Sequence, residues 1–252
     1  MTEEQWNLVE PVLRPASAGG WRGRPWHDTR AVLNGVLWVR GTGAQWRELP
    51  EKYPPCQTCH RRFQQWIRDG KLIEALRLLA RLLHEQGKLN LEEAFVDATF
   101  ASAKKGGFAI GPTRRGKGTK IVAIAADNNL PLAVTVESVS PAECHLVEDA
   151  LAASFLDELP ARLIGDKAYD SDGLDRKLDQ DYGIAMIAPN RRKRRKTQDG
   201  CPLRRYRKRW KVERLFAWMH NFRRLVNRWE YHIENYLGMV HLACLQMMLR
   251  HL

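Results

Sequence analysis

A single acidic side chain, Glu213, stands inside the most basic stretch of the chain. Between Arg191 and Arg228, sixteen Lys or Arg residues stand against two acidic ones, Asp199 and Glu213, which gives this stretch a net charge of +14. The whole chain carries +12, so the remaining residues carry −2 and the positive charge is local. A carboxylate placed there can hold a metal ion against a polyanion, which favours chemistry on nucleic acid. On charge alone, a ribosomal or other basic binding protein stays open.

Two aspartates accompany short apolar runs of the kind found in buried strands. Asp97 lies in the run 94–100, and Asp166 ends the run 161–166. Three converging carboxylates, Asp97, Asp166 and Glu213, would suit a pair of Mg²⁺ ions roughly 3.5–4 Å apart, with Mn²⁺ as a substitute. One ion would activate water or a 3′-hydroxyl, and the other would stabilise the leaving oxygen at phosphorus. Without cations the cluster would repel itself and DNA, so we expect metal.

The sequence around Glu213 predicts a long two-faced helix. Tyr206, Arg209, Glu213 and His220 fall in one stripe roughly 60° wide at about 100° per residue. Apolar residues that can hold the helix down fall opposite them: Leu215, Trp218, Phe222, Leu225 and Trp229. The polar stripe can then face phosphate. The alternative for Glu213 alone is an ordinary ion pair with Arg209, one helical turn earlier.

The hydrophobic period changes near Leu91 from helical to strand-like. Strands are predicted at residues 94–100, 120–126, 132–137, 161–166 and 184–188. Helices are predicted at residues 140–156 and 172–181. A basic linker at 190–202 is followed by a predicted helix of about 25 residues, and a last helix is predicted from 235 to the end. This order of elements is that of an α/β fold of the ribonuclease-H-like kind, a mixed five-stranded sheet with flanking helices.

That element order gives the three carboxylates a common place. In ribonuclease-H-like folds the first and fourth strands lie side by side, so Asp97 and Asp166 would be neighbours. The helix after the fifth strand can carry Glu213 over them. The sequence therefore predicts one site built from three distant segments.

Residues 1–88 look helical, and we expect them to form a small all-α module before a catalytic domain at 89–252. A helix capped by Asp28, a tight turn and a second helix beginning near Thr58 indicate a helix-turn-helix. The second helix exposes side chains suited to base edges, Arg61, Arg62 and Gln65. Upstream, Arg22 and Arg24 could form a basic arm for a minor groove. A plain helical bundle with a solvated face is the alternative.

Composition excludes several other classes. No apolar run reaches the roughly 18 residues of a membrane span, and the acidic start lacks a signal core, so we expect a cytoplasmic protein without membrane contact. Five scattered cysteines indicate reduced thiols. A haem-attachment pattern at residues 56–60 is set aside because nothing supports export. A phosphate-loop pattern at 111–118 is set aside because Gly118 stands where Ser or Thr is needed.

The blocks that carry these residues resemble the DDE transposases of bacterial insertion sequences, specifically the IS-five group. The resemblance runs along nearly the whole chain. Its blocks are residues 96–99 around the first Asp, 111–120 before the second strand, 165–172 around the second Asp, and 206–213, where Tyr206, Arg209 and Glu213 match the family's Y-(2)-R-(3)-E-(6)-K signature. Residues 22–25, 46–50, 57–58 and 62–63 resemble its N-terminal module.

The resemblance implies a transesterase that cuts at terminal inverted repeats and joins the ends to target DNA. It also implies an oligomer, such as a dimer, holding both ends of double-stranded DNA, with Tyr206 and Arg209 contacting the end. His220 stands where the signature has Lys. Because His is often uncharged at neutral pH, the affinity for the DNA end or the choice of flanking base at this contact stays open. No β-rich insertion separates Ala188 from Tyr206, so we expect less support for chemistry through DNA hairpins.

Two alternatives of other classes remain. A nuclease of the same fold, such as a junction resolvase, is disfavoured because structure-specific nucleases need no sequence-reading module. A decayed or co-opted transposase that only binds DNA is disfavoured because all three carboxylates are present. The basic segment 191–196 could clamp DNA or be solvated, and the sequence does not choose between these.

Overall fold

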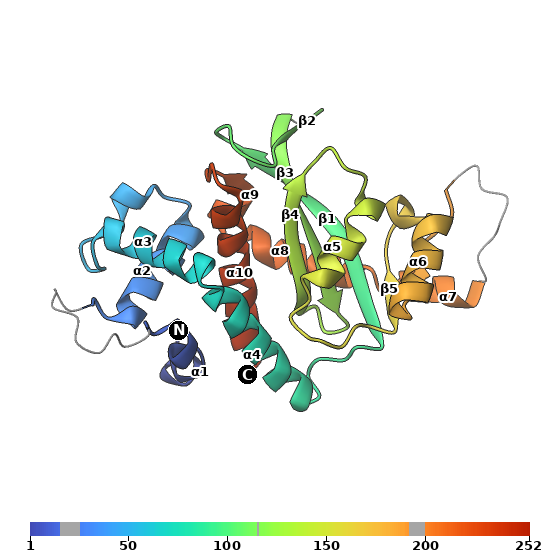
Figure 1. Cartoon of the computed structure of the whole chain (residues 1–252), viewed down its shortest axis with the longest axis horizontal. Coiled ribbons are helices and arrows are strands. Elements are labelled where there is room, and N and C mark those ends of the chain that lie inside the picture. The colour runs from blue at the N-terminus through green and yellow to red at the C-terminus, as the bar shows by residue number, and fades with distance from the viewer. Residues whose placement is uncertain (16–25, 115, 192–199) are drawn as a thin grey trace.

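The chain was analysed as a computed structural model that describes residues 1–15, 26–114, 116–191 and 200–252 (Figure 1). In this described part, a seven-stranded sheet has the order β2-β3-β1-β5-β6, with β4 also paired to β3 and β7 to β1. The strands are β1 (Glu93–Ala103), β2 (Gly111–Thr113), β3 (Gly116–Ala126), β4 (Pro131–Ser138), β5 (Arg162–Ile164), β6 (Ala185–Ile187) and β7 (Asn227–Arg228). The α/β architecture is ribonuclease-H-like, as predicted.

The sheet contains both parallel and antiparallel strand pairs, and the pairing shows where β1 loses β5 as its neighbour. β1 runs antiparallel to β3 and parallel to β5, and β5 runs parallel to β6. The parallel pairing ends at Phe95 and Ile164, and from Asp97 onward β1 becomes less buried. The first and fourth predicted strands are therefore neighbours, which confirms the prediction that their ends would meet. β2 and β7 are short additions to the five strands that the sequence predicted.

Among the described residues, four helices and a 3-10 turn precede the sheet: α1 (Glu3–Leu13), α2 (Thr29–Thr42), η1 (Trp46–Glu48), α3 (Cys56–Arg68) and α4 (Lys71–Glu85). Asp28 caps α2 as predicted, because its carboxylate accepts the Ala31 N–H at 2.7 Å. Phe63 and Trp66 turn from α3 into the core that α2 and α4 share. The helical module is thus packed on its inner face and polar outside.

The remaining helices surround the sheet: α5 (Val147–Ala152), α6 (Asp172–Tyr182), α7 (Gly200–Tyr206), α8 (Trp210–His220), α9 (Arg223–Val226) and α10 (Ile233–Leu249). α8 packs against β1 and β3, and α10 packs against α4, α3 and β4. In Figure 1, α10 lies between the N-terminal helices and the sheet. Because α10 is apolar nearly all round, it is buried on all sides. Among the described residues, no helix is long and apolar enough to cross a membrane.

Two predicted helices differ from the structure. Residues 140–156 form a 3-10 turn, η2 (Glu143–His145), followed by the short α5. The chain is held away from a helical path there, because the Lys120 ammonium donates to the Pro141 carbonyl at 2.9 Å and lies 3.6 Å from the Glu143 carboxylate.

The long predicted helix is broken between Tyr206 and Trp210. Lys208 and Arg209 lie in the break, and their side chains bond across to Glu93 and Asp97 of β1, which bends the chain toward the sheet. The break leaves Tyr206 and Arg209 outside α8, although Arg209 still pairs with Glu213 one helical turn later. The predicted apolar face is also interrupted: Trp229 lies beyond β7 and is 37% exposed.

Candidate active site

Asp97 and Asp166 are brought together by the pairing of β1 with β5. Continuing the register of Phe95 and Ile164 by two residues along each strand places Asp97 opposite Asp166. Asp166 caps the 3-10 turn η3 (Lys167–Tyr169), because one carboxylate oxygen accepts the Ala168 N–H at 2.7 Å. That contact orients the Asp166 side chain just beyond the point where β1 and β5 stop pairing.

Glu213 reaches the same place from α8 through Arg209. The Arg209 guanidinium donates to the Asp97 carboxylate at 2.7 Å and to the Glu213 carboxylate at 2.5 Å. The Asp97 side chain is 17% exposed, whereas that of Glu213 is 52% exposed. The ordinary ion pair between Arg209 and Glu213 is therefore present, and the same guanidinium also binds Asp97.

The charges in this group alter the pKa values of Asp97 and Arg209. Burial raises the pKa of Asp97; the Ala98 amide and Arg209 act to lower it, and the charges of Asp166 and Glu213 raise it further. For Arg209, burial alone would lower the pKa, but the nearby acids outweigh it and the pKa is raised. Both results show that Asp97, Asp166 and Glu213 are electrostatic neighbours around one arginine.

The sequence analysis missed a second ion pair beside this group. Glu143 in η2 pairs with the nearly buried Lys120 of β3, and η2 packs against η3, the turn that Asp166 caps. Burial raises the pKa of Glu143, Lys120 opposes this, and Asp97 and Asp166 add to it. The only signal in the sequence was a Lys at the start of an apolar strand, which by itself predicts nothing.

A buried hydroxyl also faces these acids. Tyr169 is fully buried, and among the described residues its hydroxyl has no hydrogen-bond partner. Burial raises its pKa, and the carboxylates of Glu143, Asp97 and Asp166 act in the same direction. A buried polar atom without a partner is uncommon in a folded protein.

The chemistry of this group fits a divalent cation. Four carboxylates, those of Asp97, Asp166, Glu213 and Glu143, face two cations, Arg209 and Lys120, which leaves two negative charges in excess. Oxygen ligands with excess negative charge are those that Mg²⁺ and Mn²⁺ prefer. In the described part of the chain, however, no three acidic, His or Cys side chains are arranged to hold an ion. Instead of a metal ion, Arg209 contacts two of the predicted metal ligands, Asp97 and Glu213.

The other signature positions lie around this group. Tyr206 ends α7, and the Arg209 guanidinium carbon lies 5.7 Å from its ring centroid. His220 ends α8, with its Nε2 atom 3.4 Å from the Thr99 hydroxyl, two residues beyond Asp97 on the same strand. Burial lowers the pKa of His220, so at neutral pH it carries less positive charge than a Lys would.

The three residues of α3 that were predicted to read bases differ in their exposure to solvent. Arg61 is exposed and Gln65 is half-buried. Arg62 is only 4% exposed, because its guanidinium lies 4.0 Å from the Trp26 ring centroid and donates to the Gln65 side chain at 3.3 Å. The expectation that Arg62 lies on an exposed face is wrong. Arg22 and Arg24 lie outside the described residues.

Residues 90–248 match the family described as "Transposase DDE domain", and residues 1–76 match the one described as "Putative transposase of IS4/5 family". The chain belongs to the DDE transposase family of insertion sequences. This confirms the resemblance drawn from the sequence blocks.

Relatives of this transposase chain support the assignment. It is 32% identical over 121 residues to the "Uncharacterized protein y4sN" of Sinorhizobium fredii, covering 48% of this chain and 88% of that protein. It is 32% identical over 115 residues to the "Insertion element IS402 uncharacterized 16.2 kDa protein" of Burkholderia cepacia, covering 44% and 78%. The "Putative transposase for insertion sequence element IS402" of the same organism is 38% identical over 85 residues, covering 34% and 37%.

Among solved structures, the fold is similar to that of the piggyBac transposase in a synaptic complex with hairpin DNA. The match has a TM-score of 0.52 and covers 97% of this chain and 70% of that one. At 9% sequence identity it supports the fold alone.

Proposed function

We propose that this transposase binds the terminal inverted repeats of its insertion sequence and catalyses metal-dependent strand cleavage and strand transfer. Asp97, Asp166 and Glu213 are its catalytic carboxylates. The observation that carries the proposal is the meeting of β1, β5 and α8, which gathers these three acids around Arg209. The family assignment supplies the class of reaction.

The three carboxylates would hold two Mg²⁺ ions, or Mn²⁺ in their place. When bound, these ions supply charge stabilisation for the attacking and leaving oxygens at phosphorus. The chain's own residues have other tasks. Asp166 is oriented by the Ala168 amide, and Asp97 by the Ala98 amide and Arg209. Arg209 then leaves the carboxylates to contact the DNA phosphate, assisted by Tyr206 and His220.

The DNA is recognised mainly by the helical module, for which we propose the bounds 1–88, followed by the catalytic domain at 89–252. Arg61 and Gln65 of α3 meet the inverted repeat, with Arg22 and Arg24 as a basic arm. Arg62 supports α3 from beneath Trp26, and reads a base only if that contact opens. The chain works as a homo-oligomer, a dimer on paired ends, in the cytoplasm.

The test uses the purified chain and DNA that carries the sequences flanking its own gene. We expect nicks at two inverted ends with Mg²⁺ or Mn²⁺, none without metal, and none with Asp97→Asn or Glu213→Gln. Asp157→Asn is the matched control, because this side chain is 90% exposed and makes only a loose pair with Arg81. Nicking that survives in both active-site variants would overturn the proposal.

One observation favours a second candidate, a decayed transposase that only binds DNA. Arg209 neutralises Asp97 and Glu213 in the described arrangement, which a purely structural ion pair would also do. Specific binding without cleavage in the same experiment would select this candidate. Preference for branched over linear DNA would instead select a nuclease of the same fold.

A further inference from the structure

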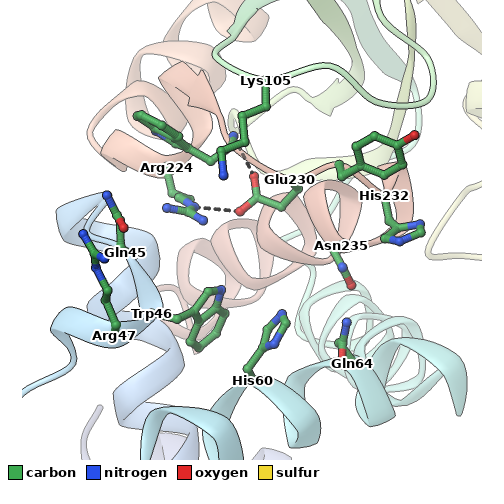
Figure 2. A pocket seen from close by; sticks show the side chains of 12 residues that line it. Gln45, Trp46, Arg47, His60, Gln64, Lys105, Arg224, Glu230, His232 and Asn235 are labelled. Carbon is green, nitrogen blue, oxygen red and sulfur yellow. Dashed lines mark hydrogen bonds and ion pairs between the residues drawn. The ribbon is translucent and has the colours of Figure 1, made fainter.

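A pocket of about 470 Å³ lies between the helical module and the loops that follow β1 and β7. Figure 2 shows Trp46, His60 and Gln64 on the side of the helical module, facing Lys105 and Glu230 across the cavity. None of the residues proposed above for catalysis or DNA reading lines it. The pocket is therefore separate from the acidic group, and through His60 and Gln64 of α3 it lies beside the proposed reading residues Arg61 and Gln65.

The walls of the pocket are fixed before any ligand arrives. Arg224 and Glu230 form a buried ion pair at 2.6 Å, and Arg224 also donates to the carbonyl of Ala44 at 3.1 Å. The second oxygen of Glu230 accepts the Trp229 N–H at 3.1 Å. The single acid of the pocket is thus neutralised and bonded on both oxygens, so it offers no free negative charge to a ligand.

The two loops on the far side are joined through their backbones. The Phe108 N–H donates to the Tyr231 carbonyl at 3.2 Å, and buried Arg228 donates to the Phe108 carbonyl at 2.8 Å and the Glu230 carbonyl at 3.0 Å. Gly107 is required for this contact, because a Cβ there would collide with the Tyr231 carbonyl. A preformed wall of this kind lowers the entropy lost on binding.

Aromatic rings provide flat apolar surfaces in and around the pocket. The Trp46 and His60 rings lie 4.8 Å apart between centroids, and burial lowers the pKa of His60, which favours its neutral form. Trp229 is 37% exposed and Tyr231 is 56% exposed, although both are large aromatic side chains. Exposed rings on a rigid wall are suited to stacking with nucleobases.

The polar groups of the pocket match the edges and phosphates of a nucleotide. Three side-chain amides line it, from Gln45, Gln64 and Asn235, each able to donate to and accept from a base edge. Lys105 adds positive charge at the pocket, where a phosphate can be neutralised, whereas Arg47 at the rim already pairs with Glu48 at 3.0 Å. A cavity of this volume admits a base but not a duplex, so its occupant must leave the stack.

We propose that this pocket binds one unpaired nucleobase of the DNA, with the adjoining phosphate near Lys105. The inference rests on the proposed function, because it takes DNA as the substrate. Lys105 follows Asp97 by eight residues along and just beyond β1, at most roughly 26 Å in an extended strand. That distance corresponds to about seven or eight base pairs. The captured base therefore lies within about seven or eight base pairs of the cut phosphate.

The experiment measures binding of the full chain to two fluorescein-labelled 30-base-pair duplexes, one fully paired and one with a single unpaired adenine. We expect wild type to prefer the second by about tenfold, since stacking on an aromatic ring contributes about 1–3 kcal/mol per base. Trp229→Ala and Gln64→Ala should lose most of this preference and keep their affinity for the paired duplex within about twofold. Tyr182→Ala, which removes an exposed ring from α6, is the control.

A second readout locates the base itself. With 2-aminopurine as the unpaired base, wild type should quench its fluorescence by stacking, and Trp229→Ala should not. Equal affinity of wild type for both duplexes, or an unchanged preference in both pocket variants, would overturn this inference and leave the proposed function standing. Failure to bind either duplex would overturn the proposed DNA substrate and the pocket assignment with it.

Discussion

At the scale of the residue, Arg209 links two tasks that the signature alone does not connect. The resemblance assigns it to the DNA end, and the structure bonds it to Asp97 and Glu213. One guanidinium cannot hold both carboxylates and a phosphate while a metal occupies the same oxygens. Binding of DNA and loading of metal are therefore expected to depend on each other through this side chain.

Arg209→Gln tests that dependence. Without the competing charge, Mn²⁺ should bind the DNA-free chain about fivefold more tightly, a change of about 1 kcal/mol. The metal-free variant should also lose about 1 kcal/mol of unfolding free energy, because Asp97 is left without its charged partner. Electron paramagnetic resonance of free Mn²⁺ measures the first effect and urea unfolding the second.

Arg214→Gln is the matched control for this prediction. Arg214 lies on the same helix and its guanidinium stacks 4.6 Å from the Trp210 ring centroid. It should leave the Mn²⁺ affinity unchanged. An equal affinity in wild type and Arg209→Gln would contradict the coupling.

At the scale of the element, α6 carries an acidic side chain that reduces its stability. Burial raises the pKa of Asp175 to about 6, and the neighbouring charge of Asp172 acts in the same direction. Because the folded-state pKa is above the ordinary Asp value of 3.8, the folded state binds more protons than the unfolded state between these two pH values. Stability is therefore lost as the pH rises through this window.

Asp175→Asn should remove this loss. The variant is expected to unfold at a higher urea concentration than wild type at pH 7.5, and to match it at pH 3.5. Asp179→Asn, on the exposed face of the same helix, should show no such difference between the two pH values. A pH-independent effect of Asp175→Asn would contradict the assignment to burial.

The elements also show how much of the fold could be predicted from the sequence. The apolar run around Val96 predicted β1, and strand order predicted that the strands leading to Asp97 and Asp166 would be neighbours, as they are. The catalytic role of these two residues and of Glu213 stays a prediction. The break between Tyr206 and Trp210 could not be predicted, since it depends on bonds from Lys208 and Arg209 to residues about 112 to 115 positions earlier. Helical periodicity contains no information about such distant partners.

Helical periodicity also cannot predict the exposure of a side chain that a distant segment covers. Arg62 was expected to be exposed, because its neighbours Phe63 and Trp66 already fill the core side of α3. Trp26, more than thirty residues earlier, covers it instead. The pair of Lys120 with Glu143 was missed for a similar reason: the two residues meet only when β3 and η2 are packed.

At the scale of the whole molecule, α10 joins the N-terminal helices to the sheet. It contacts α3 and α4 on one side and β4 on the other. Buried apolar residues form one continuous core across both parts. We therefore expect the full chain to unfold in a single cooperative transition.

Gly238→Val tests this junction. A Cβ at Gly238 would lie 2.6 Å from the Ile67 side chain and 3.0 Å from that of Phe63, so added atoms must push α10 away from α3. We expect a loss of about 1–3 kcal/mol in one transition seen by both circular dichroism and tryptophan fluorescence. Gly41→Val, where a Cβ would meet nothing within 4 Å, is the control. Two separate transitions would contradict a shared core.

Asp97, Asp166 and Glu213 are proposed to hold divalent metal when DNA is bound. The most direct measurement is the number of Mn²⁺ ions retained per chain, by electron paramagnetic resonance, on DNA carrying the element's own end. We predict about two tightly bound ions for wild type and the loss of at least one in Asp166→Asn. The Asp157→Asn control should bind as wild type does. Identical Mn²⁺ binding in wild type and Asp166→Asn would contradict the account.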